Sequence, residues 1–130
     1  MALVGYLIDT NIFLEVLLNQ RKKEDCKKFL LENAGRLFLT DFSLHSIGVI
    51  LFREKKPQIF EKMVKKFKNA IDLVALDDPF AYGEVVKISR RYKLDFDDAY
   101  QLTVADTYGL RLVTLDKHFK RINPDLVVIL

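Results

Sequence analysis

The segment LVGYLIDTN, residues 3–11, predicts the fold of this chain more directly than any other stretch. Residues 3–8 form an apolar run that is too short for a helix and is typical of a buried strand. Asp9 ends that run, and helical spacing of apolar residues begins at Asn11. A buried strand followed at once by a helix is the repeating unit of an α/β protein with a parallel sheet. We therefore expect residues 3–8 to be the central strand, with Asp9 at its carboxyl end.

The same alternation of strand and helix continues to the end of the chain. Strands are expected at residues 37–39, 71–76, 111–115 and 126–130, and helices at 11–18, 22–33, 43–53, 57–68, 79–92 and 97–108. Pro57 and the pair Asp78-Pro79 are typical of helix starts, and Gly35 and Gly109 of helix ends. With 130 residues, half of them hydrophobic, the chain suits one core and no second. We predict a single three-layer α/β domain over residues 1–130, with a mostly parallel central sheet of about five strands flanked by helices.

Charge and cysteine content narrow the class of protein. The 21 Lys and Arg exceed the 18 Asp and Glu by a net +3, which by itself predicts no nucleic-acid partner. Cys26 is the only cysteine, so a disulfide framework and a Cys-based zinc site are excluded, as suits a reducing cytoplasm. No apolar run reaches the roughly 18 residues of a membrane span, and no signal-peptide pattern is present. We predict a soluble, cytoplasmic protein with no membrane partner.

Acidic residues stand where predicted strands end and where one helix begins. They are Asp9, Asp41, Asp77 and Asp116 behind strands, and Asp95, Asp97 and Asp98 at the helix start. Because the carboxyl ends of parallel strands meet at one edge of a sheet, these carboxylates can converge. Such a cluster repels itself, and the usual neutraliser is a hard divalent cation, Mg²⁺ or Mn²⁺, that does phosphate chemistry. The pattern predicts a metal site at this edge.

Helix capping is the alternative explanation for each acid. Asp77 and Asp78 directly precede a proline and fit a cap, so both are excluded from the predicted site. Thr10 and Asn11 are themselves competent caps, which leads us to expect that Asp9 is free for another role. The loop before the helix at 97–108 supplies three carboxylates where one cap suffices.

Three segments of the chain resemble the PIN domain family, small metal-dependent nucleases that include the toxins of VapBC-type toxin–antitoxin pairs. They are LIDTNIFL at 7–14, DDAYQLTVA at 97–105 and LVTLDKHFKRI at 112–122. A strand followed by Asp-Thr-Asn, together with a strand followed by Thr-x-Asp and a later Phe, makes the resemblance fairly specific. By motif position it implies that Asp9, Asp98 and Asp116 bind the metal and are catalytic.

The resemblance extends to supporting residues and fails at one position. It implies supporting roles for Asn11, Ser43 and Thr114. The family's helix Glu, about five residues after that Ser, corresponds to Gly48 here. We expect a side chain introduced at position 48 to point toward the aspartates, and His45 is another residue that could face the cleft. If any residue replaces the missing Glu, the candidates are Asp41 from the strand end and Asp95 or Asp97 from the neighbouring loop.

The reaction that the resemblance implies is metal-assisted hydrolysis of RNA phosphodiesters. Asp97, if it is not a ligand, could accept the proton of the attacking water. Because an acidic pocket repels nucleic acid, basic residues should hold the RNA backbone on either side. The two nearest clusters in sequence are Arg90, Arg91 and Lys93 before the acidic loop, and Lys117, Lys120 and Arg121 after Asp116.

Three functions are compatible with this sequence. The first is a PIN ribonuclease, either the toxin of a toxin–antitoxin pair or an RNA-processing enzyme. The second is a catalytically degenerate PIN domain that acts as an RNA-binding or assembly module, which Gly48 favours. The third is an α/β phosphoacceptor-like enzyme, which is disfavoured because LIDTN offers a single acid after the first strand.

Large apolar residues on the predicted helices between residues 11 and 68 suggest further partners. By resemblance, such surfaces form a homodimer and, in a toxin, receive an antitoxin segment near the acidic cleft. Packing in the core is the alternative for each of them. The residues are Phe13, Leu17, Phe52, Phe60 and Phe67.

Overall fold

The computed structural model describes residues 4–130, in which five strands form one sheet in the order β3-β2-β1-β4-β5. The strands are β1 (Tyr6–Ile8), β2 (Leu37–Thr40), β3 (Ile71–Val74), β4 (Arg111–Thr114) and β5 (Val127–Ile129). Every pairing between neighbours is parallel. The predicted α/β class and the central position of β1 are confirmed, while Leu3, in the first predicted strand, lies outside the described residues.

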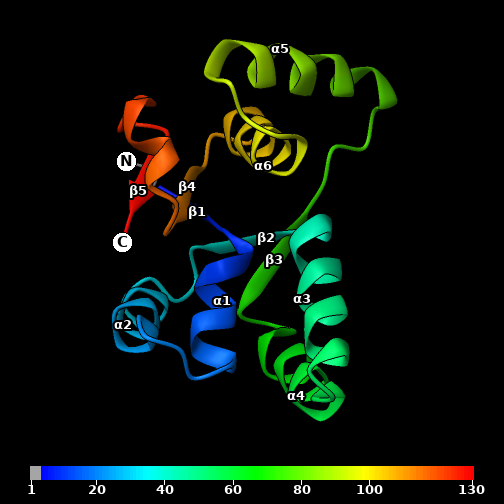
Figure 1. Cartoon of the computed structure of the whole chain (residues 1–130), viewed down its shortest axis with the longest axis vertical. Helices are drawn as coiled ribbons and strands as arrows, with labels where there is room; N and C mark the ends of the chain where they lie inside the picture. The colour runs from blue at the N-terminus through cyan, green and yellow to red at the C-terminus, as the bar shows by residue number, and fades with distance from the viewer. Residues whose placement is uncertain (1–3) are drawn as a thin grey trace.

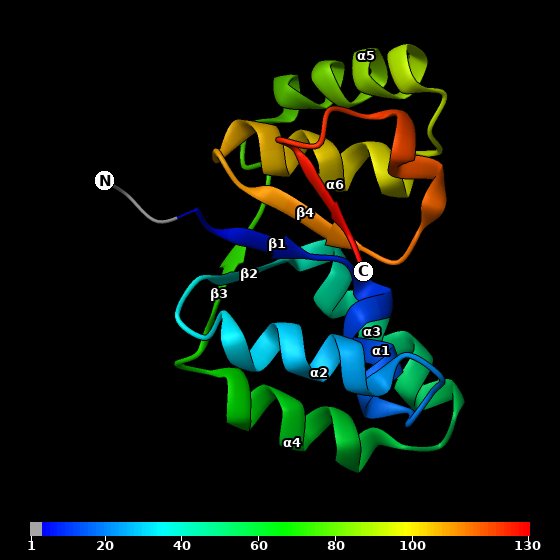
Figure 2. The same cartoon turned by 90° about the vertical axis from the view of Figure 1, so that its left-hand side faces the viewer.

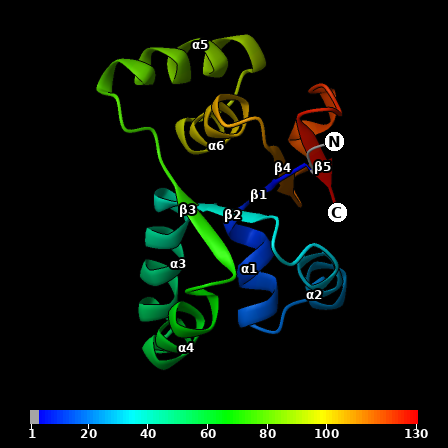
Figure 3. The ribbon, with the colours of Figure 1, turned by 180° about the vertical axis from the view of Figure 1, so that it is seen from behind.

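Helices cover both faces of the sheet. They are α1 (Thr10–Leu17), α2 (Lys23–Glu32), α3 (Asp41–Arg53), α4 (Pro57–Phe67), α5 (Tyr82–Tyr92) and α6 (Phe96–Thr107), with two short 3-10 helices, η1 (Pro79–Ala81) and η2 (Lys117–Arg121). Figures 1 and 3 show α5 and α6 on one side of the sheet and α1 to α4 on the other. The predicted three layers are therefore present.

Alternating side chains along the strands build two separate cores. Leu7 and Leu112 belong to the core under α5 and α6, whereas their neighbours Ile8 and Val113 belong to the core with α1 to α4. All four are fully buried. Because successive side chains of a strand point to opposite faces, a sheet covered on both sides needs apolar residues at every position. This is why the strands read as unbroken apolar runs.

Most predicted boundaries agree with the structure to within about two residues. Gly35 and Gly109 have φ angles of +87° and +67°, the left-handed backbone that ends a helix. The carboxylate of Asp78 accepts a hydrogen bond from the N–H of Phe80, so the predicted cap is present, but it opens η1 rather than α5 itself. The 3-10 helix η2 was not anticipated, because a short turn of this kind has no apolar periodicity.

The apolar residues expected to form partner surfaces are mostly internal. Phe13 is buried in the core, and Leu17, Phe60 and Phe67 are half-buried. Phe52 alone of the five is largely exposed, at 62%. Within residues 4–130, no helix has both the length and the hydrophobicity needed to cross a lipid bilayer.

Candidate active site

From β1 the chain adds β2 and β3 on one side of the sheet and then β4 and β5 on the other, so the strand order reverses between β1 and β4. The carboxyl ends of these two neighbouring strands lie side by side. We call this side of the sheet the carboxyl edge; in Figure 2, β1 and β4 point toward it from left to right. Asp9 directly follows β1, and Asp116 lies two residues beyond β4. In parallel α/β proteins, ligands bind in the crevice at such a switch point.

A pocket of about 240 Å³ opens at the carboxyl edge. Four aspartates line it, and no Lys, Arg or His is among the described residues that do so. We call it the acidic pocket. Its lining is Asp9, Asp97, Asp98 and Asp116, with Thr10, Asn11, Phe42, Ser46, Ile50 and Gln101. The structure thus brings together carboxylates that are up to 107 residues apart in sequence (116 − 9).

Asp9 is held by hydrogen bonds on both of its carboxylate oxygens. Oδ1 accepts from the N–H of Thr10 at 2.7 Å, and Oδ2 accepts from the hydroxyl of Thr114 at 2.8 Å. The same Thr114 hydroxyl accepts from the N–H of Asp116 at 3.0 Å. Asp9 is therefore the N-cap of α1, and the expectation that Thr10 or Asn11 would cap this helix is wrong. One carboxylate caps the helix and also borders the pocket.

Gln101, which sequence reasoning missed, ties α6 to the site. Its Nε2 donates to Ser43 Oγ and, at 3.4 Å, to Asp9 Oδ1. Ser43 also accepts from the hydroxyl of Thr10 at 2.9 Å. Gln101 follows Asp98 by three residues, so both lie on one face of the helix, a spacing that could have identified it. Its Oε1 is buried and has no hydrogen-bond partner among the described residues.

Burial and repulsion from neighbouring carboxylates raise the pKa values of two of the aspartates, Asp98 and Asp9. Burial, followed by the charges of Asp95, Asp9, Asp116 and Asp97, raises the pKa of Asp98 to about 7. Burial also raises the pKa of Asp9, and its hydrogen bonds counteract this only in part. A cation placed among these carboxylates would relieve the repulsion and favour their charged forms.

Other candidate residues lie beside the pocket rather than in it. Asp41 is exposed and accepts a hydrogen bond from the hydroxyl of Tyr100 at 2.9 Å. Asp95 is the N-cap of α6. His45 is exposed and does not line the pocket. Of the carboxylates considered as substitutes for the missing Glu, only Asp97 lines the pocket.

One face of α3 lines the pocket, and Gly48 is on another. Phe42, Ser46 and Ile50 recur at intervals of four residues and share the face toward the aspartates. A Cβ atom at Gly48 would instead lie 3.1 Å from the ring of Phe60 on α4. The expectation that a side chain at position 48 points toward the aspartates is therefore wrong. Two residues beyond Ser46 correspond to about 200° of rotation around the helix.

The two basic clusters adjoin each other instead of flanking the pocket. The guanidinium of Arg121 donates to the carbonyl of Tyr92 at 2.6 Å, so η2 lies against the carboxyl end of α5. All six cations are exposed. We call them together the basic patch: Arg90, Arg91, Lys93, Lys117, Lys120 and Arg121. It lies on the β4 side of the pocket, because η2 directly follows Asp116.

The acidic pocket offers the type of ligand atom that a hard divalent cation prefers. These ligand atoms are carboxylate oxygens, with no cationic side chain in the lining. Mg²⁺ and Mn²⁺ prefer such oxygen ligands. Within residues 4–130, no three His, Cys, Asp or Glu side chains are already arranged as a metal-binding group. The aspartates therefore line one pocket without forming such a group among the described residues.

Fold and pocket together define a class, an all-parallel α/β protein whose ligand-binding edge is acidic. Comparison with known families narrows this further, since the model of the PIN domain family matches residues 6–123. The chain therefore belongs to the PIN domain family. Comparison with curated proteins finds no match.

Several solved structures share this fold. A chain of a toxin-antitoxin complex from Klebsiella pneumoniae aligns with a TM-score of 0.77 over 95% of this chain and 96% of its own, at 22% identity. A chain of DNA-bound VapBC from Salmonella typhimurium gives 0.76 over 98% of both chains at 18% identity. VapC20 of Mycobacterium tuberculosis, a sarcin-ricin loop cleaving toxin, gives 0.74 over 89% and 93% at 11% identity. Identities this low establish the common fold.

Proposed function

We propose that this chain is a metal-dependent ribonuclease that hydrolyses RNA phosphodiesters in the acidic pocket. The observation that carries the proposal is that Asp9, Asp98 and Asp116, the three residues to which family resemblance gives metal binding, line the same pocket. Membership of the PIN domain family supports nuclease activity in general. PIN nucleases generally use divalent metal ions, and Mg²⁺ or Mn²⁺ suits the donor atoms here.

The four aspartates of the pocket, with Thr114 behind Asp9, have roles in this reaction. Asp9, Asp98 and Asp116 would hold the cation, which would supply a water of lowered pKa and offset charge on the phosphate. Thr114 fixes one oxygen of Asp9 by its 2.8 Å hydrogen bond, and so orients this ligand before the metal arrives. Asp97, which is exposed on the pocket rim, accepts the proton of the attacking water.

The basic patch holds the RNA backbone beside the pocket. Its six exposed cations can neutralise phosphates, whereas the pocket itself repels them. Because the basic patch lies on the β4 side of the pocket only, its charges hold the RNA strand on that side only. The affinity should therefore fall as salt concentration rises.

We further propose that the chain is the toxin of a toxin–antitoxin pair and forms a homodimer. Similarity in fold to chains of toxin-antitoxin complexes supports an antitoxin partner. An antitoxin could inhibit by inserting an Arg among the aspartates, since a fixed guanidinium charge competes with the cation.

A second function, RNA binding without cleavage, is favoured by one observation. The face of α3 toward the aspartates offers Phe42, Ser46 and Ile50 but no carboxylate. A pocket with fewer ligands binds its cation more weakly, because ligand charge sets much of the affinity. The domain would then serve as an RNA-binding or assembly module.

Cleavage of a labelled single-stranded RNA tests both functions. The wild type should cleave it with Mn²⁺ or Mg²⁺ and lose this activity in EDTA and in the Asp9→Asn variant. Asp125→Asn, which changes an aspartate outside the acidic pocket, is the matched control and should stay active. Metal-independent RNA binding with no cleavage under any condition would favour the binding module, and absence of both would refute the proposed function.

A further inference from the structure

Four aromatic rings from α3, α5 and α6 form one contiguous group, which we call the aromatic cluster: Phe42, Tyr82, Phe96 and Tyr100. The ring of Tyr100 lies at its centre, with centroids 6.0 Å from Phe42, 5.9 Å from Tyr82 and 6.2 Å from Phe96. The rings of Tyr82 and Phe96 are nearly parallel, at 19° and 6.4 Å. Phe42 also lines the acidic pocket. The cluster is therefore continuous with the candidate active site.

The cluster has a fixed base and an open top. Tyr100 is buried, and its hydroxyl donates to Asp41 and accepts from the N–H of Leu76 at 3.3 Å. Phe96 and Tyr82 are in contrast 53% and 41% exposed. Rings that are anchored from below and open to solvent above need little reorganisation to stack on a ligand. This is the property of a stacking platform.

The position of the cluster complements that of the basic patch. Tyr100 contacts the segments that follow β2 and β3, through Asp41 and Leu76. The basic patch lies on the β4 side, so the pocket has cations on one side and aromatic rings on the other. Phe96 directly precedes Asp97, and consecutive Cα atoms are only about 3.8 Å apart. An RNA strand that crosses the acidic pocket would reach the aromatic rings within about one nucleotide of the aspartates.

We propose that Phe96 and Tyr82, supported by Tyr100, stack against an unpaired base of single-stranded RNA next to the phosphate held at the acidic pocket. The identity of the ligand rests on the proposed function. Every base has a π-face, so a platform of this kind selects for unpaired bases and not for sequence. Bases in a duplex are stacked on their neighbours and cannot occupy it. The substrate class is therefore single-stranded RNA or an unpaired loop.

Binding in metal-free buffer tests this without requiring cleavage. The probe is a short single-stranded RNA containing 2-aminopurine, followed by fluorescence anisotropy and by quenching of the base. Phe96→Ala should weaken binding about five-fold or more, and Tyr82→Ala should weaken it in the same direction. Phe96→Trp, which keeps a ring, should retain affinity and quenching. The matching RNA duplex should bind more weakly than the single strand.

Phe52→Ala is the matched control, because Phe52 is an exposed phenylalanine that contacts another ring, Phe60, at 6.4 Å and lies outside the pocket lining. It should leave RNA affinity unchanged. Equal affinity of the wild type and Phe96→Ala would overturn the proposal. So would light scattering in which Phe96→Ala dissociates a dimer while RNA affinity stays constant, because the platform would then be an interface with a second copy.

The outcomes separate this inference from the proposed function. If Phe96→Ala weakens binding but no metal supports cleavage, the stacking platform stands and hydrolysis fails. If the RNA is cleaved but Phe96→Ala binds as tightly as the wild type, hydrolysis stands and the platform fails.

Discussion

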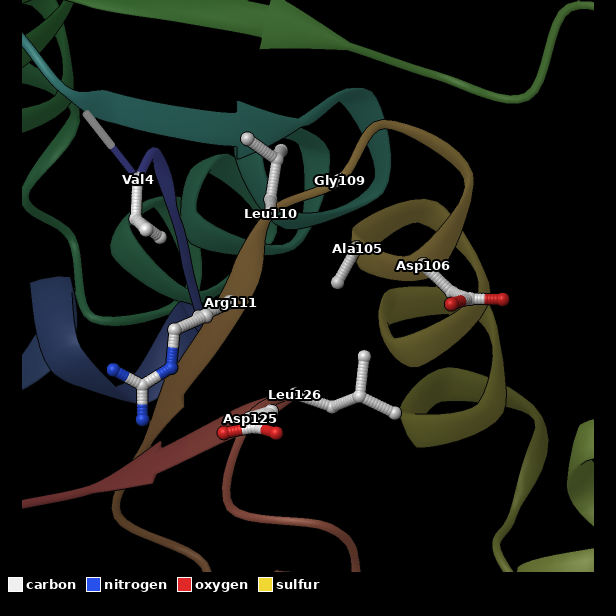
Figure 4. Close-up of a pocket in the computed structure, with 8 residues that line it drawn as sticks. All are labelled: Val4, Ala105, Asp106, Gly109, Leu110, Arg111, Asp125 and Leu126. Carbon is white, nitrogen blue, oxygen red and sulfur yellow. The ribbon is translucent and has the colours of Figure 1, made fainter. Parts of the chain in front are cut away.

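The two edges of the sheet each carry a cavity, and they differ in how charge is arranged. We call the side where the strands begin the amino edge; its cavity is the larger, at about 440 Å³ against about 240 Å³ for the acidic pocket. Its lining holds charges of both signs, on Asp106, Arg111 and Asp125. Figure 4 shows that the carboxylate of Asp106 points away from the cavity and that the guanidinium of Arg111 extends to another side. Arg111 is also engaged by the carbonyl of Pro124 at 2.6 Å. The acidic pocket is distinguished from the larger cavity by its four aspartates, which line one space, and not by its volume.

Helix dipoles explain why acids gather at the carboxyl edge. Strands that end there are followed by helix N-termini, where free N–H groups stabilise carboxylates. Asp9, Asp95 and Asp116 each accept a hydrogen bond from such an N–H. Capping thus accounts for single acids at this edge. It does not account for four carboxylates that line one pocket, where burial and the neighbouring acids raise the pKa of Asp98.

The largest expected effect comes from replacing one aspartate at the carboxyl edge and comparing it with the same replacement at the amino edge. Asp98→Asn should lower the rate of Mn²⁺-dependent RNA cleavage by at least about 100-fold, since loss of a ligand should exceed the loss of a residue that only orients one. Asp106→Asn, on the same helix but at the other cavity, should change the rate by less than about two-fold. Rates at saturating Mn²⁺ decide this. Equal losses in both variants would remove the distinction between the edges.

The two faces of α3 provide a second test. Ser46→Glu adds a carboxylate on the face that lines the pocket and should tighten Mn²⁺ binding by about ten-fold. Gly48→Glu should leave Mn²⁺ affinity unchanged. It should also lower the melting temperature despite its better helix propensity, since its Cβ would lie 3.1 Å from the Phe60 ring. Calorimetry and thermal unfolding measure both. Tighter binding in Gly48→Glu alone would show that position 48 does reach the aspartates.

The raised pKa of Asp98 predicts an unusual dependence of stability on pH. Between its ordinary pKa of 3.8 and its folded value of about 7, the folded state holds a proton that the unfolded state has lost. The free energy of unfolding should therefore fall as pH rises through this window. Because Asp98 is half-exposed, we expect a loss of only about 1–2 kcal/mol. The loss should be complete above the folded pKa, and a divalent cation should reverse it.

Urea unfolding in metal-free buffer at about pH 5 and about pH 8 measures this slope. Asp98→Asn should make it shallower, leaving the contribution of the raised pKa of Asp9, and should be more stable than the wild type at the higher pH. Asp106→Asn, at the amino edge, should keep the wild-type slope. A wild-type protein that gains stability relative to Asp98→Asn between these pH values would contradict the raised pKa.

The smallest effect concerns the basic patch. Lys120→Ala should weaken RNA binding a few-fold for all sequences and reduce the slope of log affinity against log salt by about one. Lys65→Ala on α4, whose Lys65 pairs with Glu61 at 2.9 Å, should leave the slope unchanged. Anisotropy titrations over a range of salt concentrations compare them. Equal slopes for the two variants would mean that RNA does not contact the β4 side.

The sequence alone determined the order of strands and helices and the candidate ligands. Apolar runs ended by Asp9 and by the Thr114–Asp116 turn are local signals, and parallel topology sends both to the same edge. Gly35, Gly109 and Pro57 indicated the ends of α2 and α6 and the start of α4 for the same local reason. Family resemblance then picked out three aspartates from nine others that composition alone does not separate.

Only the tertiary structure decided which helix faces and which partners meet at the pocket. The rotation of α3 turns Ser46 toward the aspartates, buries Ile47 and Leu51, and places Gly48 beside Phe60 of α4. The link from Gln101 to Ser43 spans 58 residues, and the contact from Arg121 to Tyr92 spans 29. No local pattern encodes such contacts, because the free energy of packing depends on residues brought together only when the whole chain has folded.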